Sequence, residues 1–290
     1  MDSETYALEV TELVKDYGSF KLGPISFALP KGYIMGFVGR NGAGKSTTLK
    51  CIMRSVGLDG GTVKVFGENV AENEIKIKEK IAFSTGTFES FPRAKADTLA
   101  KVYASFYPTF DFGKYDSLKK RFSLDGSKRL REMSAGMRVK FSVALAMSHD
   151  ARLYIFDEPT SGLDPVSRDE MLDLFAELIE DGEKSVLFST HITSDLDKIA
   201  DYLAIIDDGC LIANGEKDAV LAEHTLVSGA TLTGEIKDKA IGYKSTPLGF
   251  TALVKSADLP LKGAEHTARP DIEQLMIYYS KGGRRNDNRN

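Results

Sequence analysis

A glycine-rich run at residues 39–46 has the residue types and spacing needed to bind a phosphate chain. Its residues are Gly39, Arg40, Asn41, Gly42, Ala43, Gly44, Lys45 and Ser46. The glycines let the backbone curl so that N–H groups point at the phosphates, Lys45 reaches the terminal phosphates, and the Ser46 hydroxyl is offered to Mg²⁺. The apolar residues 33–38 before the run predict a short buried strand, and Thr47 opens an unbroken stretch to residue 54. The sequence therefore predicts a nucleoside triphosphate site between a strand and a helix N-terminus.

A second run supplies the carboxylates that triphosphate chemistry needs. Residues 153–156 predict a buried strand, and Asp157 and Glu158 follow at its end. Asp157 is placed to support a magnesium shell, and Glu158 can polarise a water for attack on the γ-phosphate. Each motif alone has a simpler interpretation, namely a glycine-rich turn that binds nothing or an acidic strand end that only meets solvent. Their occurrence together favours a hydrolytic site.

Composition argues against several other classes of protein. The chain has 290 residues, 42% of them hydrophobic, which is enough for a large α/β core with an appendage. A net charge of −4 with scattered lysines and arginines gives no footprint for nucleic acid, so no nucleic-acid partner is expected. Cys51 and Cys210 fit no metal spacing and predict reduced thiols of an intracellular protein. The acidic first ten residues argue against a signal peptide, and no stretch approaches the roughly 18 apolar residues of a membrane helix. Any membrane role would need a partner.

The hydrophobic patterns predict an α/β fold with a parallel core sheet. Strands are expected at residues 7–13, 25–29, 61–66, 81–83, 153–156, 186–189 and 203–206, with turn residues Gly18, Gly23 and Pro24 between the first two. Helical segments are expected around residues 171–179 and 195–200, and strands alternating with helices imply a ligand at the carboxyl ends of the strands. The first two strands predict an antiparallel β flap. A helical insert is expected from about 98 to 130, with one face formed by Leu99, Val102, Tyr103, Phe106, Tyr115, Leu118 and Phe122.

Beyond residue 215 the sequence pattern changes to short strand-like runs and one helical patch. Strand-like runs at residues 225–227, 231–233 and 251–254 are followed by a helical patch at residues 272–279. The basic end at residues 281–290 predicts a disordered tail, with a lipid-headgroup contact as the weaker alternative.

With these motifs in this order, the chain resembles the nucleotide-binding subunits of ATP-binding cassette (ABC) transporters from about residue 8 to residue 215. The resemblance implies a P-loop NTPase of ABC type that binds ATP and Mg²⁺ and dimerises head to tail around two ATP molecules. Tyr17 matches the aromatic residue that stacks on adenine, and residues 161–164, ending at Asp164, match the loop that crosses the dimer interface. His191 matches the switch histidine that contacts the γ-phosphate. Taken singly, Tyr17 and His191 are more typical of core or surface residues.

The signature that faces the opposite subunit's γ-phosphate departs from the family pattern Leu-Ser-Gly-Gly-Gln. Here it is Met133, Ser134, Ala135, Gly136 and Met137. Ser134 can still cap a helix running from about Gly136 to residue 147, and the helix dipole can meet the phosphate. Ala135 adds a methyl group where the backbone approaches closely, which predicts slower hydrolysis.

The family also places a magnesium-sensing glutamine just after the strand at residues 81–83. The single glutamine of this chain is Gln274, near its end. Residues 84–89 occupy the expected loop, where Thr85, Thr87 or Glu89 could supply an oxygen. The alternative is that this loop only links the two lobes and that a water takes the place of the glutamine.

The resemblance assigns roles to a defined set of residues. Catalysis falls to Glu158 and His191, and Mg²⁺ to Ser46 and Asp157. Nucleotide binding falls to Tyr17, Gly39, Asn41, Gly42, Ala43, Gly44, Lys45, Ser46, Thr47, Ser134, Gly136 and Asp164. The implied domains are an ABC nucleotide-binding domain at residues 1–215, with a helical subdomain inserted at about 87–150, and a small C-terminal extension at 216–290.

Residues 103–111 and 226–254 are similar to bacterial exporters of antimicrobial or amphipathic peptides, including phenol-soluble modulin exporters. The resemblance therefore implies an ATPase subunit at the cytoplasmic face of the membrane. Its expected partners are an integral membrane permease and a second ATPase subunit, either the same chain or a related one. The alternatives are a soluble ABC ATPase not linked to transport, and a regulatory ATP-binding subunit with weak hydrolysis.

Overall fold

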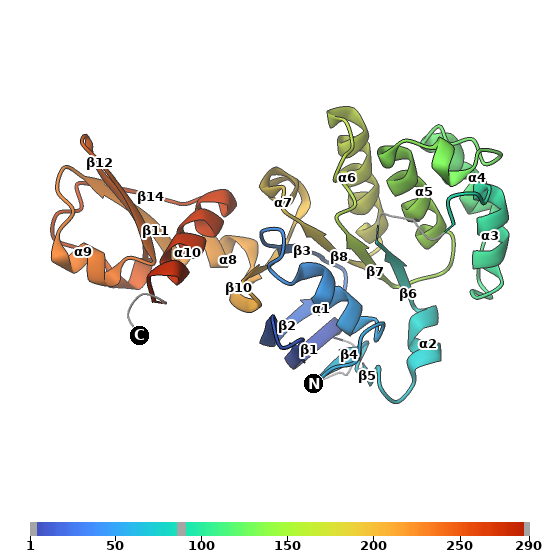
Figure 1. The fold of residues 1–290 in the computed structure, drawn as a ribbon, viewed down its shortest axis with the longest axis horizontal. Helices are drawn as coiled ribbons and strands as arrows, with labels where there is room; N and C mark the ends of the chain where they lie inside the picture. The colour runs from blue at the N-terminus through green and yellow to red at the C-terminus, as the bar shows by residue number, and fades with distance from the viewer. Residues whose placement is uncertain (1–4, 86–90, 287–290) are drawn as a thin grey trace.

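A central six-stranded sheet organises the computed structural model, which describes residues 5–85 and 91–286 (Figure 1). Its strand order is β10-β9-β3-β8-β7-β6. All neighbours are parallel except β10 and β9, which form an antiparallel hairpin. The strands are β3 (Ile34–Val38), β6 (Ile81–Ser84), β7 (Leu153–Asp157), β8 (Ser185–Thr190), β9 (Tyr202–Asp207) and β10 (Cys210–Glu216). This mixed, mainly parallel sheet confirms the α/β class expected from the sequence.

A four-stranded antiparallel sheet packs on one face of the central sheet. Its order is β2-β1-β4-β5, formed by β1 (Tyr6–Asp16), β2 (Lys21–Pro30), β4 (Gly60–Val65) and β5 (Glu68–Asn69). Helices α1 (Lys45–Ile52) and α2 (Glu74–Glu79) contribute to the same apolar layer. The opposite face carries α5 (Ala135–Met147), α6 (Pro165–Ile179) and α7 (Thr193–Ile199). Beyond α5, the helical region includes α3 (Ala96–Ala104), α4 (Phe112–Arg121) and the short turn η1 (Leu130–Glu132).

The C-terminal elements form a lobe at one end of the molecule, drawn in orange and red in Figure 1. Its sheet has the order β12-β13-β11-β14, formed by β11 (His224–Gly229), β12 (Gly242–Thr246), β13 (Gly249–Lys255) and β14 (His266–Ala268). The remaining elements are α8 (Lys217–Ala222), α9 (Gly234–Lys239), η2 (Ser256–Asp258) and α10 (Ile272–Asn286). The boundary expected at residue 215 lies inside β10, one residue before the strand ends at Glu216.

Strand β7 shows how the core holds the two layers together. All five of its residues are buried. Leu153 and Ile155 face the antiparallel sheet and α1, whereas Tyr154 and Phe156 face the helices, as the two-residue period of a strand requires. The ring of Phe156 stacks on Phe175 of α6 with centroids 4.7 Å apart. Such continuously apolar strands are typical of a sheet that is covered on both faces.

Four sequence expectations differ from the structure. Gly23 and Pro24 lie inside β2 rather than in the turn, because β1 and β2 pair with register shifts and Gly23 (φ +91°) passes so close to Leu13 that a Cβ would meet its carbonyl. Residues 231–233 are not a strand, since Thr233 caps α9 through its side chain. Val102 and Phe106 are exposed rather than on the buried face.

The fourth difference concerns the basic end of the chain. Helix α10 continues through residue 286, so residues 281–286 of the expected disordered tail are helical, and residues 287–290 lie outside the described residues. The first turns of α10 bury Ile272, Leu275 and Tyr278. A helix nucleated by that packing extends at little further cost, because each added residue gains a hydrogen bond.

No helix among the described residues has both the length and the apolar character needed to cross a membrane.

The packing of Phe175 generates a stability prediction. This side chain is fully buried between Phe156 and Phe188. We expect Phe175→Ala to lower the free energy of unfolding by about 3–5 kcal/mol, because it removes buried apolar surface and leaves a cavity. Phe106→Ala, the same change at a side chain that is 72% exposed, should alter it by less than about 0.5 kcal/mol. Urea denaturation measures both, and equal losses would contradict this account of the core.

Candidate functional site

The loop at residues 39–44 joins β3 to α1 and has the backbone that glycines permit. Gly42 and Gly44 have φ values of +83° and +110°, where other residues are strained. At Gly39 the constraint is space, since a Cβ would lie 2.3 Å from the carbonyl oxygen of Ile206. Helix α1 begins directly after Gly44, so its first N–H groups open toward the loop. This is the arrangement of strand, glycine-rich loop and helix that the sequence predicts.

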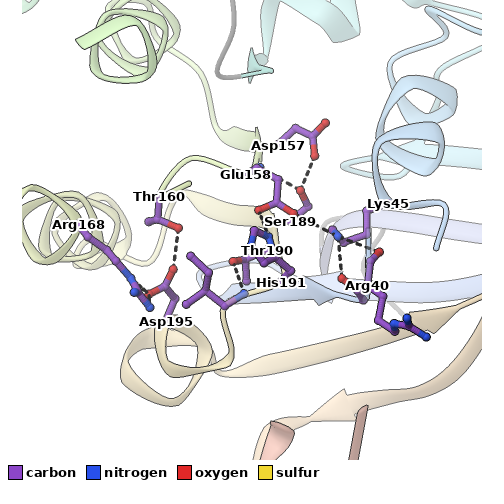
Figure 2. Close-up of polar contacts among 12 residues, drawn as sticks. Arg40, Lys45, Asp157, Glu158, Thr160, Arg168, Ser189, Thr190, His191 and Asp195 are labelled. Carbon is purple, nitrogen blue, oxygen red and sulfur yellow. Dashed lines mark hydrogen bonds and ion pairs between the residues drawn. The ribbon is translucent and has the colours of Figure 1, made fainter. Parts of the chain in front are cut away.

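Lys45 is buried at the start of α1, with 5% of its surface exposed. Its Nζ donates to the carbonyl oxygens of Gly39 at 2.7 Å and Arg40 at 3.2 Å. The same ammonium group forms an ion pair with the Glu158 carboxylate at 3.2 Å (Figure 2). Two loop carbonyl oxygens and the Glu158 carboxylate therefore surround one buried cation.

A pocket of about 260 Å³ lies over this loop. Its lining is Phe20, Arg40, Asn41, Gly42, Gly44, Lys45, Ser46, Thr47 and Glu158. Ala43 belongs to the loop but packs toward the interior, where its carbonyl accepts from the Gly209 N–H at 3.0 Å. Tyr17 is half exposed, outside the lining, with the Lys15 ammonium 5.5 Å from its ring centroid. Most of the loop residues and Glu158 therefore line one pocket, whereas Tyr17 is not part of its lining.

The ends of β7 and β8 hold the candidate catalytic side chains together (Figure 2). Ser189 donates its hydroxyl to Asp157 Oδ1 at 2.5 Å, and the Glu158 N–H donates to the Ser189 carbonyl at 3.1 Å. His191 Nδ1 lies 2.8 Å from Glu158 Oε2. Glu158 itself has φ +52°, a left-handed conformation that is strained for a residue with a side chain. One carboxylate therefore contacts both the loop lysine and the histidine.

The residues present fit a magnesium ion in their donor chemistry. Ser46 brings a hydroxyl and Asp157 a carboxylate, and Mg²⁺ prefers oxygen ligands. Among the described residues there is no cluster of three or more His, Cys, Asp or Glu side chains that could hold a metal ion. Mg²⁺ usually binds proteins through one or two side chains and takes its other ligands from phosphates and water.

Ser134, Gly136 and Asp164 form a second group, outside the lining of the loop pocket. Ser134 caps α5, as expected, by accepting from the Met137 N–H at 3.2 Å. A Cβ at Gly136 would lie 3.1 Å from the Leu163 side chain, so the start of α5 touches the loop before α6. Asp164 caps α6, and hydrogen bonds from the Ser167 hydroxyl and from the backbone lower the pKa of its carboxyl group. The chain therefore has two separate polar regions, the loop pocket and the group formed by Ser134, Gly136 and Asp164.

The loop expected to replace the sensing glutamine is described only at its start. Ser84 ends β6, and its hydroxyl lies 2.6 Å from that of Ser142 in α5. Thr85 follows, whereas Thr87 and Glu89 lie outside the described residues. Gln274 caps α10 together with Asp271, since each side chain accepts from the other's backbone N–H at 2.7–2.9 Å. The lone glutamine thus has a structural role.

Sequence reasoning missed several residues at this site. Phe20 lines the pocket, and an aromatic residue three positions after Tyr17 was the available signal. Ser189 holds Asp157, and its place at the end of a predicted strand beside that carboxylate could have indicated it. Arg168 and Asp195 are joined by an ion pair that no short motif indicates.

The C-terminal lobe reaches the site through α10. A cavity of about 640 Å³ lies between α10 and the segment around His191, and its lining includes Arg40, Met276 and Ile277. A neighbouring cavity of about 590 Å³ joins Tyr279 and Ser280 of α10 to the phosphate loop. The extension is therefore part of the surroundings of the site.

Comparisons with known proteins agree with this geometry. A family model described as "ABC transporter" matches residues 22–161. The ABC transporter ATP-binding protein YtrB of Bacillus subtilis (strain 168) is 27% identical over 293 residues, covering 96% of this chain and 99% of the relative. The bacitracin transport ATP-binding protein BcrA of Bacillus licheniformis is 31% identical, covering 71% of this chain and 68% of the relative. A solved structure described as the ATP binding subunit of an ABC transporter has a TM-score of 0.67 at 27% identity, covering 73% of this chain and 91% of that one.

Proposed function

Because this chain belongs to the ABC transporter family of ATPases, we propose that it is the ATP-hydrolysing subunit of a bacterial exporter. The observation that carries the proposal is the contact of Glu158 with both Lys45 and His191. The three side chains that the proposal assigns to binding the phosphates, activating water and contacting the γ-phosphate are therefore connected through the carboxylate of Glu158. Fold membership alone would support only nucleotide binding.

In the proposed reaction, the backbone N–H groups of residues 39–44 and the first turn of α1 hold the β- and γ-phosphates. Lys45 exchanges its contact with Glu158 for the phosphate oxygens, which satisfy the same buried cation. Tyr17 stacks on the adenine, and Thr47 and Asn41 complete the polar lining. Ser46 and Asp157 would hold a Mg²⁺ ion, which would neutralise charge on the phosphate oxygens.

Glu158, once released from Lys45, accepts a proton from a water as the water oxygen attacks the γ-phosphorus. The bond to the bridging oxygen breaks, and ADP and phosphate leave. His191 orients the carboxylate of Glu158 and contacts the γ-phosphate. The exposed fraction of the Glu158 side chain, 24%, leaves room for the attacking water.

We further propose that ATP closes two copies, or one copy and a related subunit, head to tail. Ser134, Gly136 and Asp164 lie outside the lining of the loop pocket, and in the proposed dimer they face the γ-phosphate that the opposite subunit holds. The capped N-terminus of α5 then presents its dipole to the anion. Ala135 loosens this approach and slows hydrolysis.

The proposed partner is an integral membrane permease at the cytoplasmic face of the membrane, and the proposed cargo is a peptide or similar amphipathic molecule. Similarity to a relative named for bacitracin transport supports export. The exposed Val102 on α3 and Phe106 in the turn after it provide apolar surface for a partner.

We expect Lys45→Ala to lose tight ATP binding while the fold stays intact, because the phosphates lose their buried counter-charge. Titration with a fluorescent ATP analogue measures the affinity, and circular dichroism reports the fold. Lys50→Ala is the matched control, since Lys50 is an exposed lysine in the same helix. Unchanged affinity in Lys45→Ala would contradict the phosphate-site assignment.

We expect Glu158→Gln to bind ATP at least as tightly as the wild type but to turn it over at least about 10²-fold more slowly. The amide keeps the shape, cannot accept the proton, and no longer competes for Lys45. Steady-state phosphate release and nucleotide titration separate the two effects, with Glu180→Gln on the exposed end of α6 as the control. Near-normal turnover in Glu158→Gln would assign the base to another group, with His191 the first candidate.

Mild purification of the tagged full chain from its own cells should co-purify a polytopic membrane protein, and any second ATPase subunit, in a fixed ratio. Double substitution of Val102 and Phe106 by Ser should weaken this association and leave ATP affinity unchanged. Recovery of the chain without a membrane protein, together with full ATPase activity, would favour a soluble ABC ATPase. Weak turnover in the recovered complex would favour the regulatory alternative.

A further inference from the structure

We propose that Arg168 and Asp195 are positioning residues that set the geometry of His191 against Glu158. The inference rests on the proposed function, in which those two side chains act on the attacking water. Its basis is a set of contacts among Thr160, Arg168, Ser194 and Asp195, which we call the Asp195 network (Figure 2).

The network joins the two segments that carry the catalytic side chains. Glu158 leaves the end of β7, and Thr160 follows two residues later. His191 leaves the end of β8, and Asp195 follows four residues later in α7. Thr160 Oγ1 donates to Asp195 Oδ2 at 2.6 Å, which is a direct bond between the two segments. A shift of either segment must therefore stretch this bond or carry the other segment along.

Burial makes that bond hard to exchange for water. Asp195 and Thr160 are each 1% exposed. A carboxylate so buried needs a cation and hydrogen bonds, because its charge cannot be solvated. Arg168 provides both, since its guanidinium forms an ion pair with Asp195 Oδ1. The contacts of the Asp195 network therefore pair the buried carboxylate of Asp195. A displacement of α7 would break them and leave this charge without partners.

Arg168 connects a third element, helix α6, to the Asp195 network. It lies in the first turns of α6, where its N–H donates to the carbonyl of Asp164 at 2.9 Å. Its second guanidinium nitrogen donates to Ser194 Oγ at 2.6 Å. The planar fork of arginine can hold a carboxylate and a hydroxyl in fixed directions, which a lysine ammonium cannot do. One side chain therefore anchors the His191 segment to the helix that follows Glu158.

The two catalytic side chains are themselves partly exposed, so the positions of their backbones matter for their contact. The side chain of His191 is 40% exposed and that of Glu158 is 24% exposed. Their 2.8 Å contact depends on where the two segments place their backbones. A misplacement of about 1 Å can cost on the order of 10²-fold in rate, even when the change lies away from the reacting atoms. Loss of the Asp195 network should therefore lower turnover and spare ATP binding.

The test uses Arg168→Lys in the full-length chain, because this change keeps the positive charge beside Asp195 and loses the fork. Arg121→Lys is the matched control. Arg121 of α4 makes a bidentate ion pair, at 2.5 and 2.8 Å, with Glu177 of α6, the helix that also contains Arg168. We expect Arg168→Lys to lower kcat by about 10–100-fold with ATP affinity changed less than about twofold. Arg121→Lys should change neither quantity. Thr160→Val, which removes only the hydroxyl bond, should give a smaller loss of the same kind.

A double-mutant cycle with His191→Ala distinguishes positioning from a general loss of structure. If Arg168 acts through His191, Arg168→Lys should cost less than about twofold once His191 is alanine. An equal loss in both backgrounds, or wild-type kcat in Arg168→Lys, would overturn the proposal while leaving ATP hydrolysis in place. Failure of the proposed function itself would appear separately, as unchanged ATP affinity in Lys45→Ala or unchanged turnover in Glu158→Gln.

Discussion

Parallel pairing of β3, β7 and β8 is the constraint on which the site depends. Register places Val38 beside Thr190 and Asp157 beside Ser189, so the three strands end at one edge. The segments that leave this edge carry the phosphate loop, the paired carboxylates and His191. A parallel sheet is stable only when both faces are covered. The antiparallel sheet and the helices therefore support the site by burying the strands that align it.

A buried ammonium adds an electrostatic constraint at this edge. Lys45 cannot remain charged in the interior without partners, and it finds them in two carbonyl oxygens and Glu158. Phosphate oxygens offer the same cation a denser set of negative charges. In the proposed reaction, phosphate oxygens replace the Glu158 carboxylate as partners of the Lys45 ammonium. The base proposed to activate water becomes free when the substrate takes its place, which limits the exposure of an active carboxylate without nucleotide.

How far the sequence predicted the molecule depends on how local each feature is. The phosphate loop, the strand before Asp157 and the Ser134 cap are set by neighbouring residues, and the structure has each of them as expected. Gly23 and Pro24 misled because turn residues also occur at irregularities within paired strands. The Asp195 network was invisible because Thr160, Arg168 and Asp195 meet only after three elements pack. Strand β14 is three residues long and exposed, which leaves no periodic signal.

Continuity of the core makes the C-terminal lobe more than an appendage. Leu226, Leu253, Ile272 and Leu275 belong to the same apolar cluster as the helices of the main domain, whereas Val227, Phe250 and Val254 form a smaller cluster of the lobe's own. Lys217 also donates to the carbonyl of Asp197 at the end of α7 at 3.1 Å. Helix α7 follows His191 directly and contains Asp195. Removal of the lobe would therefore expose apolar surface and leave the end of α7 without these contacts.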